Sequence, residues 1–536
     1  MLGYAQKCGI AVAVLFLAAV CVITMAGRAE AAVRFVDPCW ADRTLVPASF
    51  DYLTTAFGSL TAAIRAAAPG DRIVLNPGRY EEPVEQFPIV VDKAITICSA
   101  QGNAETIISG PPIKPVFEMK APGVEIYGLT IEFKRYGMVV LADGVRICGN
   151  RLVLAAPAYR QTSCGIWLAG ARKAQVTDNE FVDCGLSIAG PPVSDTSENL
   201  PVLTGLFEVG EDSDFFTTHR IERNLVNGKP LYYLVNAEGV NVPKDVGQVI
   251  LAGCRDITLD GLDVSYASTG IELAYCQGVH VTNVTASGCG LFGVYLCYAD
   301  ACEIAGVTCN EDTHGLDLRA AQRNLVRNCN VTGCGQGIFL SWASDNLVTD
   351  CNVQGNGVGV FIASGERNEV ASSRIIQNDL GLNVKNEQSL LLSENLISGN
   401  ARTGVRLHNT GCTFYGNSLL ENWVGLIATD SSEITISSNR FCANAQSGLY
   451  MMNLDRVKIT RNQFTGNRNN DLEAAGRLTN ALILQNSFTD PQGIILNDTA
   501  NSVDLSLNWW GTTDSEQIAK RCRGAVKYAP FLTTVP

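Results

Sequence analysis

The chain has 536 residues and a formal net charge of −13, with 17% charged and 7% aromatic residues. So acidic a composition, without a basic stripe, excludes nucleic acid as the expected partner. Four histidines and six methionines are few for a protein built around a metal. We therefore predict no metal site and no cofactor, although calcium and copper stay open.

Residues 1–31 have the pattern of a secretory signal peptide. Lys7 supplies the positive end, residues 10–25 are apolar, and Ala29-Glu30-Ala31 is a small-residue cleavage site. We expect a secreted, periplasmic or cell-surface protein. An uncleaved membrane anchor is the alternative, and contact with a membrane is expected only through this segment.

Residues 32–70 are predicted to hold a short strand and a capping helix. The best helical run is 57–68, with Ser59 as N-cap and Pro69-Gly70 as the stop. A lone helix before a repeat region covers the open end of its core. The run AAIRAAAPGDRIVLNPGRYEE, at 62–82, resembles the opening of secreted right-handed β-helix proteins of the pectin-lyase-like superfamily. That resemblance implies a right-handed coil.

A spacing of 22 residues organises the chain from 262 to 467. The same column of each block holds Cys329, Cys351, Ser373, Asn395, Asn417 and Asn439. Each block also has a Gly followed by an aliphatic residue, in short runs with apolar residues two apart, which is strand periodicity. The blocks are too short for a long helix. We predict an all-β, single-stranded right-handed parallel β-helix over 71–505, with the asparagines of one column bonded along the stack.

Two segments depart from the repeat. Residues 187–218 carry prolines and acids and are interpreted as a loop off the helix. Residues 506–536, with Asn508-Trp-Trp-Gly, resemble the closing element of secreted β-helix proteins and are predicted to cap the C-terminal end. The runs that begin at Asn224 and Gly247 are similar to the NosD-type β-helix family, which includes periplasmic copper-associated proteins.

Signal cleavage would leave 17 of the 19 cysteines, since Cys8 and Cys21 would be removed. The pairs Cys254 and Cys276, and Cys329 and Cys351, stand 22 apart and would lie in register. Coils ~4.8 Å apart allow a disulfide, but a buried stack of thiols packs equally well. We predict mostly free thiols.

The residues two after each repeat glycine point outward, because neighbouring strand residues point to opposite faces. This column and its extension are predicted to bind a polysaccharide or cell-surface glycan, since sugar rings stack on aromatic faces. Ordinary strand-forming aromatics are the alternative interpretation. The predicted ligand-binding residues are Trp167, Glu272, Tyr295, Asp317, Phe339, Phe361, Arg406 and Tyr450.

The densest polar run contains His314, Asp317 and Arg319, which are the catalytic candidates. His314 and Asp317 are suited to acid–base work. The alternative is that His314 is an exposed turn residue. His314-Gly-Leu-Asp-Leu resembles the active-site strand of polygalacturonases, which need a second aspartate one coil away. Here that coil reads Gly335-Gln-Gly.

Three functions remain open from the sequence. The first is an exported binding or structural module that binds carbohydrate, and the absence of a complete catalytic signature favours it. The second is a polysaccharide lyase, hydrolase or epimerase acting near Asp317. The third, which the NosD resemblance implies, is a periplasmic copper-associated role.

Overall fold

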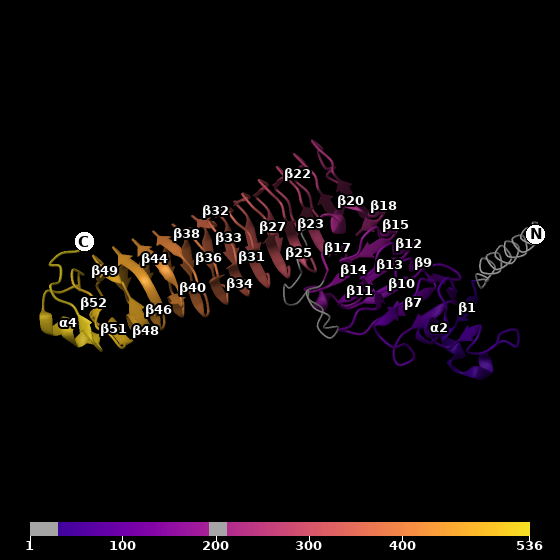
Figure 1. Cartoon of the computed structure of the whole chain (residues 1–536), viewed down its shortest axis with the longest axis horizontal. Helices are drawn as coiled ribbons and strands as arrows, with labels where there is room; N and C mark the ends of the chain where they lie inside the picture. Colours follow the sequence, from indigo (N-terminus) through magenta and orange to yellow (C-terminus); the bar gives the residue numbers. More distant parts are fainter. Residues whose placement is uncertain (1–30, 192–211) are drawn as a thin grey trace, which may run out of the picture.

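The computed structural model describes residues 31–191 and 212–536. They form a right-handed parallel β-helix, seen as an elongated stack of coils in Figure 1. The expected signal peptide, apart from Ala31, and most of the expected 187–218 loop lie outside the described residues. Within the described ranges, every helix is too short or too polar to cross a membrane.

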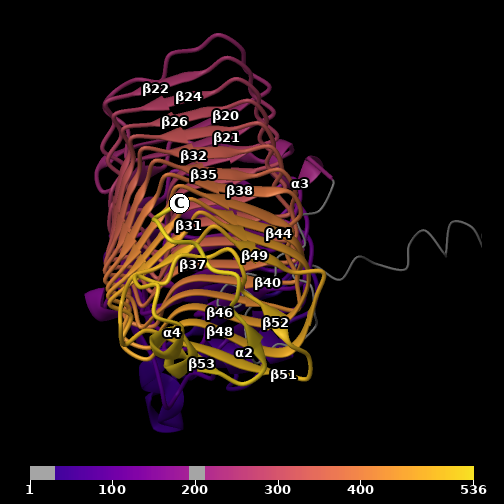
Figure 2. The ribbon, with the colours of Figure 1, turned by 90° about the vertical axis from the view of Figure 1, so that its left-hand side faces the viewer.

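Each coil of the C-terminal part contains three strands separated by turns. β43 (Val424–Thr429), β44 (Ser432–Ser437) and β45 (Arg440–Cys442) make one such coil. Each strand pairs in parallel with its counterpart in the preceding coil, so the stack has a first, a second and a third face (Figure 2). Asp430 and Ser438, at the corners between these strands, adopt φ values of 50° and 57°. Short polar side chains tolerate this left-handed conformation best.

These coils from β20 onward are called the second stack. Its first face comprises β20 (Lys229–Val235), β21 (Gln248–Ala252), β23 (Thr269–Ala274), β25 (Phe292–Cys297), β28 (His314–Arg319), β31 (Gln336–Ser341), β34 (Val358–Ala363), β37 (Leu380–Lys385), β40 (Thr403–His408), β43, β46 (Ser447–Thr460), β48 (Asn470–Thr479), β51 (Ile494–Thr499) and β53 (Cys522–Arg523). Long strand β46 turns the corner and also contributes to the second face.

The second face comprises β22 (Thr258–Asp260), β24 (His280–Thr282), β26 (Glu303–Ala305), β29 (Leu325–Arg327), β32 (Leu347–Thr349), β35 (Glu369–Ala371), β38 (Leu390–Ser393), β41 (Cys412–Tyr415), β44 and β49 (Leu482–Leu484). The third face comprises β27 (Thr308–Asn310), β30 (Asn330–Thr332), β33 (Asn352–Gln354), β36 (Arg374–Ile376), β39 (Leu396–Ser398), β42 (Ser418–Leu420), β45, β47 (Gln463–Thr465) and β50 (Ser487–Phe488).

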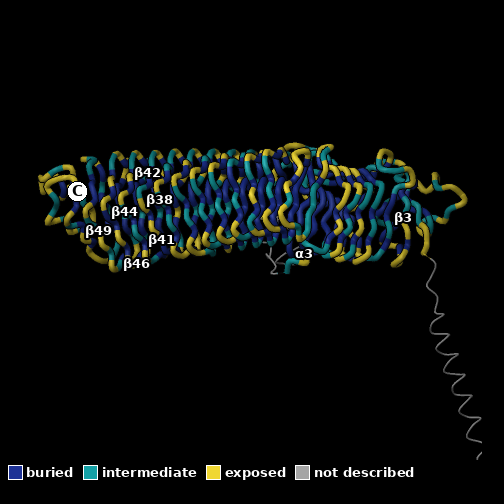
Figure 3. Tube along the Cα trace, turned by 90° about the horizontal axis from the view of Figure 1, so that it is seen from above, coloured by how far each residue is buried: buried dark blue, intermediate teal, exposed yellow. Residues whose placement is uncertain are grey.

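Apolar side chains fill the inside of the coils. Along the chain, buried residues alternate with exposed and intermediate ones (Figure 3). Leu316, Ile338, Val360 and Leu382 occupy one inward column, each at most 1% exposed. Phe441 and Phe464 stack in another column, with ring centroids 4.8 Å apart. Stacking of identical positions thus makes one continuous core from many short strands.

Buried asparagines run along the stack in ladders. Asn395 donates from its amide nitrogen to the side-chain oxygen of Asn417 at 3.0 Å, and Asn417 does the same to Asn439 at 3.1 Å. The 22-residue spacing therefore predicted this ladder correctly. A second ladder runs from Asn356 through Asn467 and ends on the carboxylate of Asp471. Every step satisfies buried amide groups at the coil corners.

The N-terminal coils form a separate first stack with three sheets. One has β1 (Val33–Val36), β2 (Ala56–Phe57), β3 (Arg72–Leu75), β6 (Thr96–Ser99), β9 (Glu125–Tyr127), β12 (Arg146–Cys148), β15 (Gln175–Thr177) and β18 (Arg220–Glu222). Another has β4 (Gly78–Tyr80), β7 (Thr106–Ser109), β10 (Thr130–Phe133), β13 (Arg151–Leu154), β16 (Glu180–Val182) and β19 (Leu225–Val226). The last has β5 (Ile89–Val91), β8 (Phe117–Met119), β11 (Tyr136–Val140), β14 (Cys164–Ala169) and β17 (Leu186–Ala189).

The two stacks meet at a bend, visible near β17 and β20 in Figure 1. β19 and β20 pair antiparallel around the Asn227-Gly228 turn, unlike the parallel pairs of the coils. The two stacks have separate cores, and outward residues of the second stack such as Ile250 and Ala274 pack into the first core. The β-helix is thus two stacks, the end of one resting on the first face of the other.

Short helices lie at both ends. α2 (Leu60–Ala66) begins after Ser59, whose hydroxyl accepts from the Ala62 amide as predicted, and buries Leu60, Ala63 and Ile64 against β1, β2, β3 and β5. α4 (Ser515–Arg521) buries Ile518 in the second core. α3 (Asp214–Thr217) and the 3₁₀ turns η1 (Pro38–Ala41), η2 (Arg43–Leu45) and η3 (Pro157–Tyr159) complete the helices described, with β52 (Val503–Asp504) and β54 (Val526–Lys527) paired beside α4.

Candidate functional site

The predicted outward column exists as a row of in-register neighbours on the first face. Tyr295 pairs with Asp317, Asp317 with Phe339, Phe339 with Phe361, and the next two positions are Asn383 and Arg406. The alternation of the strands therefore placed these side chains in one line along the stack.

The expectation that this column is exposed along its whole length is wrong at its N-terminal end. Glu272, Tyr295 and Asp317 are each at most 3% exposed, and Trp167 in the first stack is 1% exposed. The cause at Glu272 is the bend, because its Oε2 accepts from the Ile188 amide at 3.2 Å and lies 3.5 Å from the Ser187 hydroxyl. The end of the first stack thus covers the first coils of the face.

The three catalytic candidates form a closed ion cluster. Arg319 donates to both oxygens of Asp317 at 2.9 Å, and Nδ1 of His314 lies 2.7 Å from Asp317 Oδ2. The expected exposure of His314 is wrong, since it is 9% exposed, and Arg319 is 2% exposed. The guanidinium lies over the rings of Phe292, Tyr295 and Phe339 at 5.2–5.8 Å.

This geometry sets the charge state of Asp317. Burial acts to raise the pKa of Asp317, but the Arg319 charge and the His314 contact outweigh it, so the pKa lies below its ordinary value. The carboxylate stays ionised with both oxygens engaged. It is therefore held as a counter-charge to Arg319, an arrangement unlike a free acid or base.

The accessible part of the column begins one coil later. The rings of Phe339 and Phe361 stack at 4.9 Å with 6° between their planes, and both are half-buried. Nζ of Lys385 lies 6.0 Å from the Phe361 ring centroid. Arg406 is exposed in the next coil. We call Phe339, Phe361, Asn383, Lys385 and Arg406 the platform.

Two predicted ligand-binding residues lie away from the platform. Trp167 belongs to β14, where its ring stacks on Tyr136 at 6.2 Å. Tyr450 lies two coils beyond Arg406 in the same column, half-buried, with its hydroxyl 3.6 Å from Met452 Sδ. The column thus divides into a buried cluster, a platform and a distant tyrosine.

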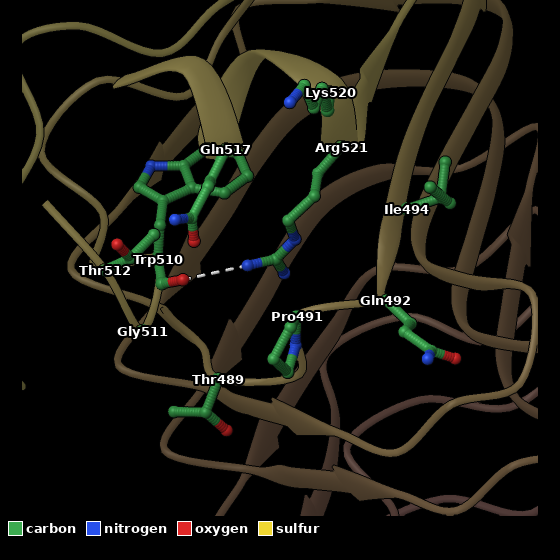
Figure 4. A pocket seen from close by; sticks show the side chains of 10 residues that line it. All are labelled: Thr489, Pro491, Gln492, Ile494, Trp510, Gly511, Thr512, Gln517, Lys520 and Arg521. Carbon is green, nitrogen blue, oxygen red and sulfur yellow. Dashed lines mark hydrogen bonds between the residues drawn. The ribbon is translucent and has the colours of Figure 1, made fainter. Parts of the chain in front are cut away.

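One hollow could not be predicted from the sequence, because its residues follow no repeat pattern. It has a volume of about 250 Å³ and lies at the C-terminal end between α4 and the last coils (Figure 4). Arg521 reaches into its wall and donates to the carbonyls of Gly493 and Trp510 at 2.8 Å, with Asp471 at 3.3 Å. Arg521 thereby ties α4 to the end of the second asparagine ladder.

The described cysteines, from Cys39 to Cys522, are all free, in agreement with the predicted free thiols. Burial raises the pKa of the Cys164 thiol to about 12. Most of the other thiols are buried as well and lie along the inside of the coils. They therefore behave as small apolar core residues.

Three family models match overlapping parts of the chain. "Periplasmic copper-binding protein (NosD)" matches residues 224–401, "Right handed beta helix region" matches 342–508, and "Protein of unknown function (DUF1565)" matches 53–249. Fold and repeats thus define a right-handed parallel β-helix repeat protein. The residues that match the first model begin at β19 and lie almost wholly in the second stack. No curated protein matches the chain.

The solved structures that the chain matches include two epimerases and a lyase. The periplasmic alginate epimerase AlgG is 12% identical, over 82% of this chain and 88% of that chain, with a TM-score of 0.30. The A-module of mannuronan C-5 epimerase AlgE6 from Azotobacter vinelandii is 13% identical, over 83% and 92%, at 0.22. An alginate lyase from Paenibacillus sp. str. FPU-7 is 14% identical, over 66% and 97%, at 0.25. These TM-scores are too low to transfer ligand or activity.

The name of the first model raises the question of copper. Copper sites gather thiolate, thioether or imidazole ligands at one point. Across 31–191 and 212–536, no three His, Cys, Asp or Glu side chains come together to hold an ion. His314 instead contacts Asp317, which Arg319 already neutralises. The described residues therefore contain no cluster of three such ligands that could hold copper.

Proposed function

We propose that this protein is exported and binds an acidic polysaccharide on the platform. The observation that carries the proposal is the order in which aromatic and cationic side chains follow one another over four consecutive coils. Two stacked, accessible rings, Phe339 and Phe361, are followed by two exposed cations, Lys385 and Arg406. Among the described residues neither cation has an ion-pair partner.

The chemistry of uronate sugars matches these groups. The C–H face of a sugar ring packs on an aromatic face, and a guanidinium binds a carboxylate through two parallel hydrogen bonds. Four platform coils span ~14 Å at ~4.8 Å per coil, which suits a short stretch of an extended chain. A ligand lying along the stack would meet the rings first and the cations next.

The negative net charge of the whole molecule indicates that a polyanion would be bound through the platform cations. A net charge of −13 repels a polyanion at long range, so binding must come from contacts on the platform. Salt screens both this repulsion and the attraction of the platform cations. Because the cations lie closest to the bound carboxylates, we expect the affinity for a polyuronate to fall as ionic strength rises.

Binding without turnover fits the cluster better than catalysis does. A lyase, hydrolase or epimerase acting at Asp317 would need that carboxylate in contact with substrate. Here Asp317 is 0% exposed and accepts two hydrogen bonds from Arg319. Incubation with polygalacturonate should therefore release no unsaturated or shortened products.

Export rests on the sequence of residues 1–31. Its basic start, apolar run and Ala29-Glu30-Ala31 site support cleavage after Ala31. N-terminal sequencing of the protein from its native host should read Ala32 first. A retained Met1 in the protein from its native host would contradict this part of the proposal.

The binding experiment compares polygalacturonate with neutral dextran by titration calorimetry. Phe361→Ala should weaken polygalacturonate binding about five-fold or more, because a stacking aromatic contributes ~1 kcal/mol. Arg406→Ala should weaken it and flatten its salt dependence. Tyr159→Ala, an exposed aromatic (43%) in the first stack, is the matched control and should change nothing. Unchanged affinity in both platform variants would refute the assignment of the site.

A further inference from the structure

The second face of the second stack carries a hollow of about 370 Å³ that the platform does not include. It lies over β41, β44, β46 and β49, around a corner from the first face. We call it the trough. Its lining residues are Tyr415, Thr435, Ser437, Ser438, Lys458, Thr460, Arg461, Leu482, Leu484 and Gln485.

The hollow has a physical cause in the register of the strands. Tyr415 pairs with Ser437, Ser437 with Thr460, and Thr460 with Leu484. Small hydroxyl side chains thus occupy the two middle coils between a large ring and a leucine. Tyr415 is 47% exposed, so its ring lines one side of the hollow and is accessible to a ligand. On the floor, Ser437 is half-buried and Thr460 is 7% exposed, so Ser437 has the more accessible hydroxyl for a polyhydroxylated ligand.

The charge of the trough has one sign. None of its lining residues is acidic, and two of them, Lys458 and Arg461, are basic and exposed. In the part of the chain that the structure describes, neither forms an ion pair. Nearby Arg456, by contrast, pairs with Glu433 and Asp455. Lys458 and Arg461 are therefore available to an anion from outside.

We infer that the trough is a second binding site, for a short stretch of carboxylate-bearing sugar chain, and that the protein is bivalent. Tyr415 would stack on a sugar ring, the hydroxyl of Ser437 would meet a sugar hydroxyl, and Lys458 and Arg461 would bind carboxylates. The ligand class rests on the proposed function, whereas the site itself uses none of the platform residues.

Titration calorimetry with tetragalacturonate tests this inference, with maltotetraose as the neutral control. The wild-type chain should bind two equivalents. The Lys458→Ala/Tyr415→Ala double variant (the trough variant) should bind one, and so should the Phe361→Ala/Arg406→Ala double variant (the platform variant). Lys458→Arg should keep both equivalents, because it keeps the charge, and equal melting temperatures confirm that the variants are folded.

The other outcomes separate the two proposals. One equivalent in the wild type, lost in the platform variant, would overturn the trough and leave the platform standing. One equivalent, lost in the trough variant and kept in the platform variant, would overturn the platform and support the trough. No binding of tetragalacturonate would overturn both.

A long polymer gives an independent readout of bivalency. Wild-type protein mixed with polygalacturonate should cross-link chains and raise light scattering, with a maximum at an intermediate protein ratio. Each single-site variant should bind without that maximum. A wild-type curve that matches the single-site variants would contradict bivalency.

Discussion

The burial and the pKa of Glu272 are set by the contact between the two stacks. Glu272 is 0% exposed, its Oε2 accepts from the first stack, and its Oε1 has no hydrogen-bond partner among the described residues. Burial raises the pKa of Glu272 from 4.5 to about 8, against the smaller effect of its hydrogen bonds. The carboxyl group of Glu272 is thus kept in its protonated, neutral form near neutral pH by its position at the bend.

This pKa predicts a pH dependence of stability. The folded-state pKa lies above the ordinary one, so the stabilisation from the bound proton is complete below about pH 4.5 and lost as pH rises through about 8. Glu272→Gln, which stays neutral, should remove this loss. Melting curves from pH 5 to pH 9 should show the wild type falling relative to the variant. Parallel curves for the two proteins would contradict the assigned pKa.

Asp317 gives the opposite case, a buried carboxylate held in its charged form. Asp317→Asn removes the counter-charge that Arg319 contacts through two hydrogen bonds. Breaking one partner of a buried pair costs ~3–5 kcal/mol, so the free energy of unfolding should fall by about that amount. Chemical denaturation measures it. A variant as stable as the wild type would show that the cluster is not structural.

Among elements, the asparagine ladder was the most predictable feature. Its spacing of 22 gave the register, and the stacking of Asn395, Asn417 and Asn439 is confirmed. The outward direction of Phe339 and Phe361 followed from strand alternation in the same way. The trough was not predictable, because it depends on side-chain sizes at Ser437 and Thr460 in adjacent coils.

The ladder predicts a contrast between two asparagines of the same stack. Asn417→Ala removes bonds to Leu392 O, Tyr415 O and Asn439 and orphans the groups of Asn395. Each buried orphan costs ~1–3 kcal/mol, so a loss of ~3 kcal/mol or more is expected. Asn352→Ala removes one exposed bond, to Asn330, and should cost under ~0.5 kcal/mol. Equal losses in urea denaturation would argue against the ladder as a stabilising element.

At the scale of the whole molecule, the bend was beyond sequence reasoning. The contacts that make it, such as Gly185 N to Ser268 Oγ at 2.8 Å and Leu186 N to Gln248 Oε1 at 3.1 Å, join residues 83 and 62 positions apart. They follow no period, so the repeat pattern predicted the coils but not the burial of Glu272 and Tyr295 beneath the first stack. The first stack covers the first coils of the first face, and the platform is part of the face that remains accessible.

The most direct test of the account is a crystal structure of the mature protein with tetragalacturonate. We predict a sugar ring packed against Phe361 and a carboxylate within hydrogen-bonding distance of Arg406 or Lys385. Asp317 should remain paired with Arg319 and out of contact with the ligand. A tetragalacturonate bound with Asp317 at its scissile bond, or one that leaves Phe361 and Arg406 untouched, would contradict the proposed function.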